Sequence, residues 1–265
     1  MKNNTKVSIL MTCYNASKFI EQSIKSIKNQ TYKNWELVII DDLSTDKTIK
    51  IIKKFNDKRI KIFYLKKHIG RTKALNYGLK KISSKLIAIL DADDLAHKNR
   101  IKTQVEFLED NRNTSLVGTW YKVIDEKGKF IELVKTEIEK DKIYKNMLVR
   151  NVFCHSSIMF RKSIINKIGN YPSEIIYSQD YAFLLKAMKL QVPSIIPKYL
   201  TISRRWSNSM TYSSEYKKNI KIDSIKHMLY SIKNFKFTFK SSFLLYLKFI
   251  KNLIELTLIK LFLTE

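Results

Sequence analysis

The strongest candidate for chemistry in this sequence is an acidic cluster, Asp91-Ala92-Asp93-Asp94, which directly follows an apolar segment. Its three carboxylates repel one another, because two unit charges about 4 Å apart cost about 4 kcal/mol at an effective dielectric constant of about 20. A divalent cation reverses the sign of this interaction, and carboxylate oxygens suit Mg²⁺ or Mn²⁺ that also binds phosphate oxygens. The cluster therefore predicts a metal site, with a polar turn before a helix as the alternative.

Two more polar segments follow apolar ones. Asp41-Asp42 places adjacent carboxylates where acidic residues of dinucleotide-binding folds accept hydrogen bonds from ribose hydroxyls. In residues 12–15, Tyr14 can stack on a heterocyclic base while Thr12 or Asn15 forms a hydrogen bond with its edge. Turn and helix-cap chemistry, which Asn15 alone would satisfy, is the simpler interpretation of this last segment taken by itself.

These polar segments need a scaffold in which several strands end beside one another. Four short segments rich in Val and Ile have the length and the bounding turn residues of buried strands, and apolar residues recur at helical spacing between them. This alternation predicts an α/β fold with a Rossmann-like mixed sheet, mainly parallel and flanked by helices, which binds ligands beyond the carboxyl ends of its strands. The predicted strands are residues 6–12, 36–40, 60–65 and 85–90.

After residue 98 the pattern loosens but continues as the same α/β unit. No linker rich in Pro, Gly or Ser separates the two halves, so we divide one continuous domain into two lobes, residues 1–98 and 99–210. In the second lobe the predicted helices are residues 98–109, 139–149 and 181–190, and the predicted strands are residues 115–124, 129–134, 153–160 and 194–204.

Residues 211–265 are predicted to form a basic amphipathic helical extension. Within 241–263, fourteen Leu, Ile and Phe residues would gain roughly 6 kcal/mol in a bilayer, whereas four charged residues would cost roughly 10 kcal/mol near its centre. A membrane-spanning helix is therefore not expected. A basic face with many apolar residues fits peripheral contact with an anionic membrane, self-association through residues 216–265, or packing on the main domain, and these alternatives stay open.

The composition excludes collagen-like, low-complexity and disordered proteins. The 265 residues carry 50 Lys plus Arg against 24 Asp plus Glu, a formal charge of +26, and 45% of them are hydrophobic, so a packed core is expected. Two cysteines make neither a disulfide framework nor a zinc site, and no early apolar run is long enough for a signal peptide. We expect a cytoplasmic location. No nucleic-acid partner is expected, because the sequence has no RNA-binding motif or Cys/His finger.

The order of the polar motifs resembles that of the family-2 glycosyltransferases. The matching segments are residues 7–15, 41–46, 70–78 and 91–94, and the resemblance extends from about residue 6 to 210. It implies a GT-A fold, a nucleoside diphosphate sugar as donor with UDP as its nucleotide, and Mn²⁺ or Mg²⁺ as cofactor. By the same resemblance, the first lobe binds the nucleotide sugar. The second lobe binds the acceptor, a saccharide or a lipid-linked saccharide.

The resemblance also implies which residues bind the donor. The nucleotide base would be contacted from the ends of the first two strands, and the ribose from the end of the fourth. Arg71 and Lys73 are candidates to steer the phosphates, with a solvated helix face as the alternative. The residues so implied at the base are Thr12, Tyr14 and Asp42, with Asn15 beside them, and Asp91 is implied near the ribose.

Two residues carry the implied chemistry. Asp93 would hold the metal ion bound to the donor diphosphate. Gln179-Asp180 resembles the Glu-Asp motif of the family, which implies that Asp180 is the catalytic base; without the family, a helix N-cap is the simpler interpretation. His155 is more often a hydrogen-bonded core histidine than a ligand, and we expect that role here.

The sequence departs from the family pattern at three positions. Leu43 stands where the family usually has Gly, which affects the turn after Asp42 more than the chemistry. Trp206 occupies a position that is usually His, which leaves a third protein ligand for the metal open. Ile202 stands where processive synthases have Gln, so processive polymerisation is not expected.

The sequence therefore predicts an inverting, metal-assisted glycosyltransferase that moves a sugar from a nucleoside diphosphate sugar to an acceptor hydroxyl. The resemblance further implies cell-surface polysaccharide assembly. The basic C-terminal segment is compatible with a peripheral position at the inner face of the cytoplasmic membrane. One alternative is a nucleotidyltransferase of similar α/β build, although a triphosphate-binding loop is not found. The other is a non-catalytic basic protein that associates with a membrane or with nucleic acid.

Overall fold

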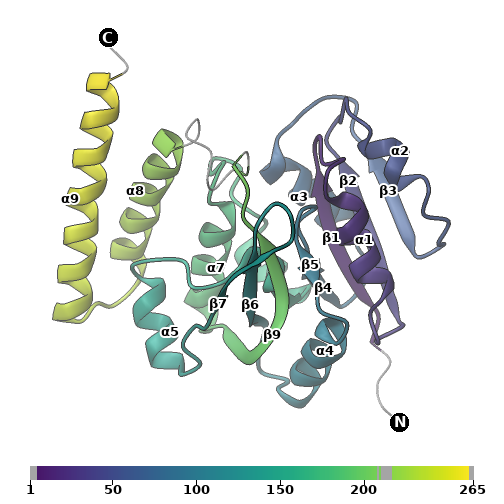
Figure 1. The fold of residues 1–265 in the computed structure, drawn as a ribbon. Helices are drawn as coiled ribbons and strands as arrows, with labels where there is room; N and C mark the ends of the chain where they lie inside the picture. Colours follow the sequence, from purple (N-terminus) through teal and green to yellow (C-terminus); the bar gives the residue numbers. More distant parts are fainter. Residues whose placement is uncertain (1–4, 208, 210–216, 263–265) are drawn as a thin grey trace.

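The computed structural model describes residues 5–207, 209 and 217–262, which form one mixed sheet flanked by helices (Figure 1). Within these residues the strands join in the order β3-β2-β1-β4-β8-β6-β9-β5, and β7 pairs with β6 off this path. The α/β fold predicted from the sequence is thereby confirmed. The strands are β1 (Val7–Cys13), β2 (Trp35–Asp41), β3 (Ile60–Tyr64), β4 (Leu86–Ile89), β5 (Leu95–Ala96), β6 (Leu116–Ile124), β7 (Phe130–Val134), β8 (Met159–Arg161) and β9 (Ser194–Arg204).

The direction of the strands decides where the polar segments lie. β1 runs parallel to both β2 and β4, and β2 runs parallel to β3. β6 and β9 form a further parallel pair, whereas β5, β7 and β8 are held by antiparallel pairing. Because β1, β2 and β4 point the same way, the residues that follow them meet at one edge of the sheet.

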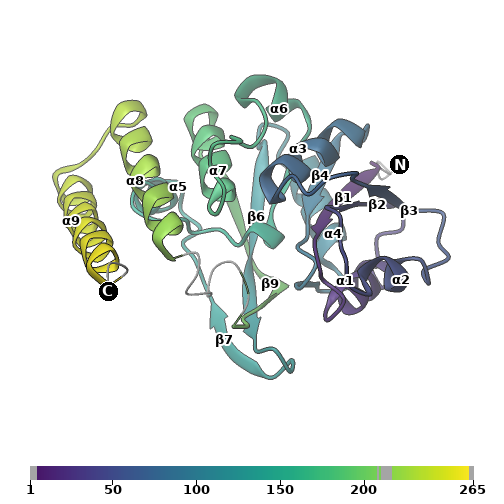
Figure 2. The same cartoon turned by 90° about the horizontal axis from the view of Figure 1, so that it is seen from above.

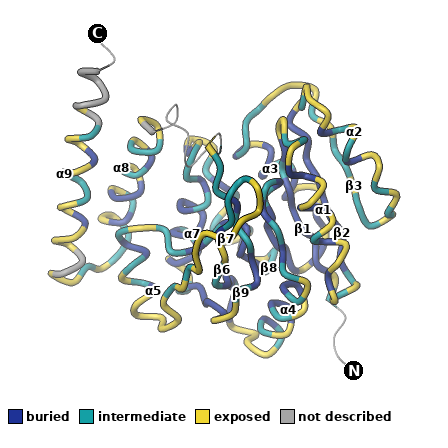
Figure 3. Tube along the Cα trace, in the orientation of Figure 1, coloured by how far each residue is buried: buried dark blue, intermediate teal, exposed yellow. Residues whose placement is uncertain are grey.

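Helices cover both faces of the sheet (Figure 2). One face is packed against α3, α5, α6 and α7, and the other against α1, α2 and α4. Buried residues follow the sheet and its covering helices in Figure 3, so the core consists of two apolar layers with the sheet between them. The helices of these layers are α1 (Ile20–Lys28), α2 (Thr48–Ile52), α3 (Arg71–Lys81), α4 (Arg100–Asp110), α5 (Lys140–Met147), α6 (Ser163–Ile168) and α7 (Gln179–Leu190).

Side chains of strand β1 alternate between the two apolar layers. Leu10 belongs to the layer under α3, whereas Ile9 and Met11 belong to the layer under α1, as the two-residue period of a strand requires. Gly78 lets α3 approach the sheet closely, because a Cβ atom at this position would lie 2.3 Å from Cδ1 of Leu10. This contact fixes the helix that begins with Arg71 against β1 and β2.

The strand predicted over residues 153–160 is wrong for most of its length. His155–Ser157 form a 3-10 helix, and only Met159–Arg161 pair as β8. The hydroxyl and the N–H of Ser157 both donate to the carbonyl of Cys154, which closes a tight turn. The buried apolar residues on either side have the composition of a strand, but the turn between them directs His155 toward the end of β4.

The extension predicted after residue 210 is helical. α8 (Lys217–Asn234) and α9 (Phe239–Phe262) pack against each other, and α8 also contacts α7 (Figure 1). Among the described residues, no helix has the length and hydropathy needed to cross a membrane. The predicted boundary between residues 210 and 211 lies outside the described residues, as does Tyr216 at the start of the basic segment.

Candidate functional site

Arg71, the first residue of α3, connects polar groups that are distant in the sequence. Its Nη2 donates to Oδ2 of Asp91 at 2.6 Å and lies 3.1 Å from Nδ1 of His155. In the amide orientation that satisfies both of its groups, the side chain of Gln179 accepts a hydrogen bond from Nε of Arg71 at 3.2 Å. Arg71 therefore bridges the end of β4 and the start of α7, and is not part of a solvated helix face.

The electrostatics of Arg71 show which carboxylates lie around it. Burial by itself lowers the pKa of the guanidinium, but three carboxylates raise the pKa above its ordinary value. In order of effect they are Asp91, Asp180 and Asp93. The sequence assigns Asp91 to the ribose, Asp180 to the role of catalytic base and Asp93 to the metal. All three therefore act on the charge of one arginine.

Asp91 is ionised in this environment. Burial by itself raises the pKa of its carboxyl, but the charges of Arg71 and His155 hold the pKa well below its usual range. Oδ1 of Asp91 lies 3.3 Å from Nδ1 of His155, whose Nε2 lies 3.0 Å from the hydroxyl of Tyr171. His155 is 6% exposed, so it is a buried, hydrogen-bonded histidine as expected, and it connects Asp91 to Tyr171 of the apolar core.

Asp93 has the properties of a metal ligand. Burial and the neighbouring charge of Asp91 raise the pKa of its carboxyl, so the ionised form lacks a full counter-charge. One oxygen, Oδ2, accepts a hydrogen bond from Nε1 of Trp206 at 2.9 Å. Within the described residues, no group of three or more His, Cys, Asp or Glu side chains is placed to hold a metal. The residues therefore fit a cation that takes one protein carboxylate and completes its ligands with phosphate oxygens.

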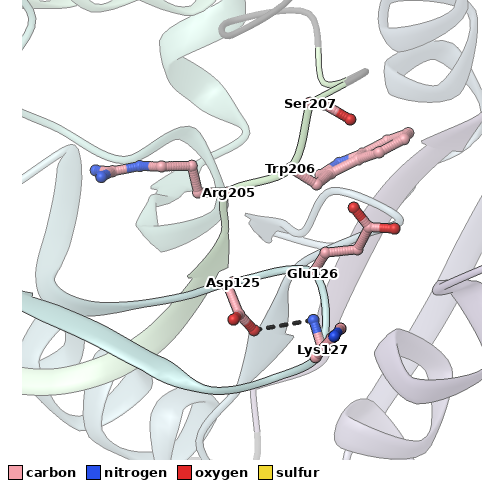
Figure 4. A pocket seen from close by; sticks show the side chains of 6 residues that line it. All are labelled: Asp125, Glu126, Lys127, Arg205, Trp206 and Ser207. Carbon is pink, nitrogen blue, oxygen red and sulfur yellow. Dashed lines mark hydrogen bonds between the residues drawn. The ribbon is translucent and has the colours of Figure 1, made fainter.

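Trp206, which donates to Asp93, also lines a hollow of about 540 Å³ (Figure 4). The hollow lies between the turn that joins β6 to β7 and the segment after β9. An indole N–H is a donor only, so Trp206 cannot supply the metal ligand that His would supply at this position. The lining residues are Asp125, Glu126, Lys127, Arg205, Trp206 and Ser207.

The third carboxylate of the cluster, Asp94, has a structural role. Its Oδ1 accepts the backbone N–H of Arg204 at 2.7 Å, and Arg204 Nε in turn donates to the carbonyl of Asp93 at 3.0 Å. Burial and the charges of Asp93 and Asp91 raise the pKa of Asp94 well above its usual range. Asp94 therefore ties the acidic turn to the end of β9, which leaves Asp93 directed toward Trp206.

Asp180 lies in the first turn of α7 and is half-buried. Its Oδ2 accepts a hydrogen bond from Nδ2 of Asn151 at 2.8 Å. Asn151 precedes the tight turn that carries His155, so a single loop contacts both Asp180 and Asp91. A carboxylate held by a hydrogen bond at a fixed position is one of the side chains that can act as a general base.

Asp42 accepts two hydrogen bonds from the loop that leads into α3. Oδ1 accepts the N–H of Ile69 and Oδ2 accepts the N–H of Gly70, both at 2.8 Å. Gly70 has φ +83°, a conformation that side chains rarely adopt. Leu43, at the position where the family has Gly, has φ +67°, so the departure noted in the sequence leaves the turn strained. Asp42 thus positions Arg71, which follows directly.

Tyr14 and Asn15 differ in whether their side chains are engaged by other residues of the protein. Tyr14 is 48% exposed, and its ring lies 4.2 Å from that of His68, which itself contacts Asp42 at 3.0 Å. Asn15 has φ +48°, and its side-chain oxygen accepts the N–H of Thr45 at 2.8 Å. Asn15 therefore makes the turn contacts that were its simpler interpretation, whereas Tyr14 keeps an exposed aromatic ring.

The other two predicted donor-binding residues lie in β1 and α3. Thr12 is half-buried near the end of β1, two residues before Tyr14. Lys73 is exposed on α3, which agrees with the solvated-face alternative. Sequence reasoning did not assign Asn151 or His68 to the site, and neither lies in a motif that could have marked it. Trp206 was noted only as a departure, although its contact with Asp93 makes it part of the site.

We expect Asp42→Ala to lower the free energy of unfolding by about 1–3 kcal/mol, because two half-buried N–H groups lose their acceptors. Asp42→Asn is the matched control, since its amide oxygen keeps one of the two bonds and should lose about half as much. Urea unfolding measures both changes. An alanine variant as stable as the parent would show that Asp42 does not hold the loop.

A protein-family model described as "Glycosyl transferase family 2" matches residues 8–169, more than half of the chain. The chain is 32% identical over 256 residues to an uncharacterized glycosyltransferase of Haemophilus influenzae, which covers 88% of this chain and 77% of that protein. It is 33% identical over 217 residues to an uncharacterized glycosyltransferase of Methanocaldococcus jannaschii, which covers 80% of this chain and 74% of that one.

Two solved structures share the fold. TarS of S. aureus in complex with UDP superposes with a TM-score of 0.69 at 21% identity, over 92% of this chain and 70% of that one. The mannosyltransferase PcManGT of Pyrobaculum calidifontis, in complex with GDP-Man and Mn²⁺, superposes with a TM-score of 0.67 at 17% identity, over 94% of this chain and 70% of that one. The architecture is therefore the GT-A fold expected from the sequence.

Proposed function

Because the chain belongs to glycosyltransferase family 2, we propose that it transfers a sugar, with inversion, from a nucleoside diphosphate sugar to an acceptor hydroxyl. The observation that carries the proposal is that Arg71 bonds Asp91, two residues before Asp93, and also Gln179, the neighbour of Asp180. A carboxylate suited to a metal and one suited to a base thus lie around one cation. The family match ends at residue 169, so the role of Asp180 depends on this geometry and on its resemblance to the Glu-Asp motif.

The donor would bind across the carboxyl ends of β1, β2 and β4. Tyr14 offers an exposed ring on which a base can stack, and Thr12, Asn15 and Asp42 lie beside it or shape its loop. Asp91 lies at the ribose, and Arg71 and Lys73 contribute positive charge toward the phosphates. UDP is the proposed nucleotide, since TarS has been crystallised with UDP and with UDP-GlcNAc.

In the transfer step, Asp180 removes the proton of the acceptor hydroxyl as its oxygen attacks C1 of the sugar. The C1–oxygen bond to the diphosphate breaks on the opposite face, and the nucleoside diphosphate leaves. Asp93 would hold Mn²⁺ or Mg²⁺, which supplies a Lewis acid for the charge on the diphosphate. Arg71 holds Asp91 through a hydrogen bond and keeps its carboxylate charged, and Asn151 orients the base.

A panel of nucleotide sugars tests this function. The protein is incubated with Mn²⁺ and, in turn, with UDP-glucose, UDP-galactose, UDP-GlcNAc or GDP-mannose, and the nucleoside diphosphate released is measured. We expect release from a UDP-linked sugar, first to water and faster to a saccharide or lipid-linked saccharide. Release of pyrophosphate from a nucleoside triphosphate and a sugar phosphate would instead identify a nucleotidyltransferase, and no release from any donor would contradict the proposal.

We also propose that α8 and α9 contact an anionic membrane at its inner face, where a lipid-linked acceptor would be found. Residues 217–262 contain ten Lys against two acidic residues, and the lysines are complementary to anionic lipid. Large apolar side chains are exposed on the same helices, as an interfacial helix requires. They are Ile222, Leu229, Ile232, Phe239, Phe243, Leu244, Tyr246, Leu247, Leu253 and Ile254.

Vesicle sedimentation tests the membrane contact. The protein should sediment with phosphatidylcholine vesicles that contain phosphatidylglycerol, and much less with phosphatidylcholine alone, because the lysines need anionic lipid. The double variant Phe243→Asp, Leu247→Asp should lose this binding. Phe130→Asp, at an exposed position on β7, is the matched control and should bind as the parent does. Equal sedimentation with both vesicles, or a dimer that the double variant dissociates, would contradict the membrane contact.

A further inference from the structure

The segment that carries Asp180 is held by α8, a helix that follows the whole α/β domain in sequence. α8 packs beside α7, as Figures 1 and 2 both show. It lies far outside residues 8–169, which the family model matches. Two of its polar side chains, Asp223 and His227, are 3% and 4% exposed, and they are directed at the residues just before α7.

Several hydrogen bonds connect α8 to this segment. The N–H of Tyr177 donates to Oδ2 of Asp223 at 3.0 Å, and Nε2 of His227 lies 2.7 Å from the hydroxyl oxygen of Ser178. Lys226 Nζ donates to the carbonyl of Glu174 at 3.2 Å. The contacts are therefore spread over the whole approach to α7, so the position of its first turn depends on α8.

At Ser178, the contact with α8 replaces the usual helix-capping hydrogen bond. It is the N-cap residue of α7, where a serine hydroxyl usually accepts the N–H of the second or third helical residue and stabilises the helix by about 1 kcal/mol. Here the N-cap makes no side-chain hydrogen bond to the helix. The hydroxyl pairs with His227 instead. The local capping interaction is given up for a contact with α8, two residues from Asp180.

The surroundings of His227 determine its protonation state. Its ring packs edge-on against Tyr181 with centroids 4.8 Å apart, and burial lowers the pKa of the imidazole to about 4. The ring is therefore neutral at pH 7 and cannot act as a counter-ion for Asp180. Its contribution is the hydrogen bond and the packing. The start of α7 is thus held by Asn151, which precedes it in sequence, and by His227, which follows it.

We propose that His227 and Asp223 are positioning residues for the catalytic base: through Ser178 and Tyr177 they set where the carboxylate of Asp180 lies relative to Arg71. The inference depends on the proposed role of Asp180 as the base. A displacement of about 1 Å at a reacting group can cost about 100-fold in rate. Loss of these contacts should therefore lower kcat while donor binding, which uses β1, β2 and β4, is kept.

Ser178→Ala is the sharpest test, because it removes one hydroxyl that makes no capping bond. Its kcat for nucleoside diphosphate release, measured with Mn²⁺ and the best donor of the panel above, should fall by about 10- to 100-fold. The Kd for UDP with Mn²⁺, measured by calorimetry, should stay within about twofold. Ser178→Thr keeps the hydroxyl and should restore most of kcat.

His227→Phe tests the same bond from α8, since it keeps a ring against Tyr181 and loses the nitrogen. It should lower kcat as Ser178→Ala does, and the double variant should be no slower than either single variant, because all three lack one shared bond. Ser224→Ala is the matched control: it removes a serine hydroxyl of α8 that bonds only Asn252 of α9 in the described structure, and kcat should not change.

Two results would overturn the positioning role. One is a Ser178→Ala protein with the kcat of the parent, and the other is a variant that loses UDP affinity and kcat together, as general loss of structure would cause. Asp180→Asn separates this failure from failure of the proposed function. If Asp180→Asn is inactive while Ser178→Ala is fully active, only the positioning role is wrong; if Asp180→Asn is also fully active, the base assignment is wrong.

Discussion

Asp180→Asn should reduce turnover by about 10²- to 10⁴-fold, the usual contribution of a well-placed general base. The amide is nearly isosteric with the carboxylate and can still accept the hydrogen bond of Asn151, so the fold should be unchanged. It cannot take a proton from the acceptor hydroxyl. The Kd for UDP in the presence of Mn²⁺ should stay within about twofold, because Asp180 is not proposed to contact the nucleotide.

The matched control for this variant is Asp141→Asn. Asp141 is an exposed aspartate in the first turn of α5, so the same helix-terminal charge is removed far from Arg71. Its turnover should equal that of the parent. If Asp180→Asn retained ordinary turnover, or lost UDP binding together with turnover, Asp180 would not be the base.

Asp93→Asn should weaken the binding of UDP as well as turnover. The neutral amide can still accept the hydrogen bond of Trp206, but it is a poor ligand for a hard cation. A bound metal typically provides several kcal/mol of charge stabilisation. Since each 1.4 kcal/mol is tenfold, turnover should fall by more than about 100-fold. The Kd for UDP with Mn²⁺ should rise by at least about tenfold.

Metal removal should reproduce this variant. Addition of EDTA to the parent protein should lower turnover and UDP affinity to the level of Asp93→Asn, and EDTA should have little further effect on the variant itself. Asp110→Asn, at an exposed position at the end of α4, is the control and should remain sensitive to EDTA. An Asp93→Asn protein with unchanged Mn²⁺ dependence would place the metal elsewhere.

The sequence predicts the first half of the fold more completely than the second. The strands from β1 to β4 are apolar runs with clear turn residues, and the helices between them carry one apolar face each. The signal is weaker where elements are short. β5 has two residues, and residues 153–160 have a strand-like composition although His155–Ser157 turn as a 3-10 helix. The pairing of β5 with β9 is long-range, and the turn at His155–Ser157 depends on the hydrogen bonds of Ser157 to Cys154; composition records neither.

The sequence proposes candidate site residues where a motif contains the residue itself. The carboxylates of Asp91, Asp93 and Asp180 all act on the charge of Arg71, and their roles in the reaction stay predictions. The groups that orient them were not predictable, because Asn151 and Tyr171 reach the site through loops whose path no pattern specifies. Asp42 shows the converse case, since its carboxylate oxygens bond the loop before α3 in addition to any ligand.

The central claim is that Asp93, Asp180 and the end of β1 serve one bound nucleotide sugar. A crystal structure of the protein with UDP and Mn²⁺ tests it most directly. We expect Mn²⁺ bound to Asp93 and to both phosphates, the uracil ring stacked on Tyr14, and Asp180 facing the outer phosphate across a space the size of a sugar ring. Mn²⁺ bound away from Asp93, or UDP on a surface that Asp180 does not face, would contradict the account.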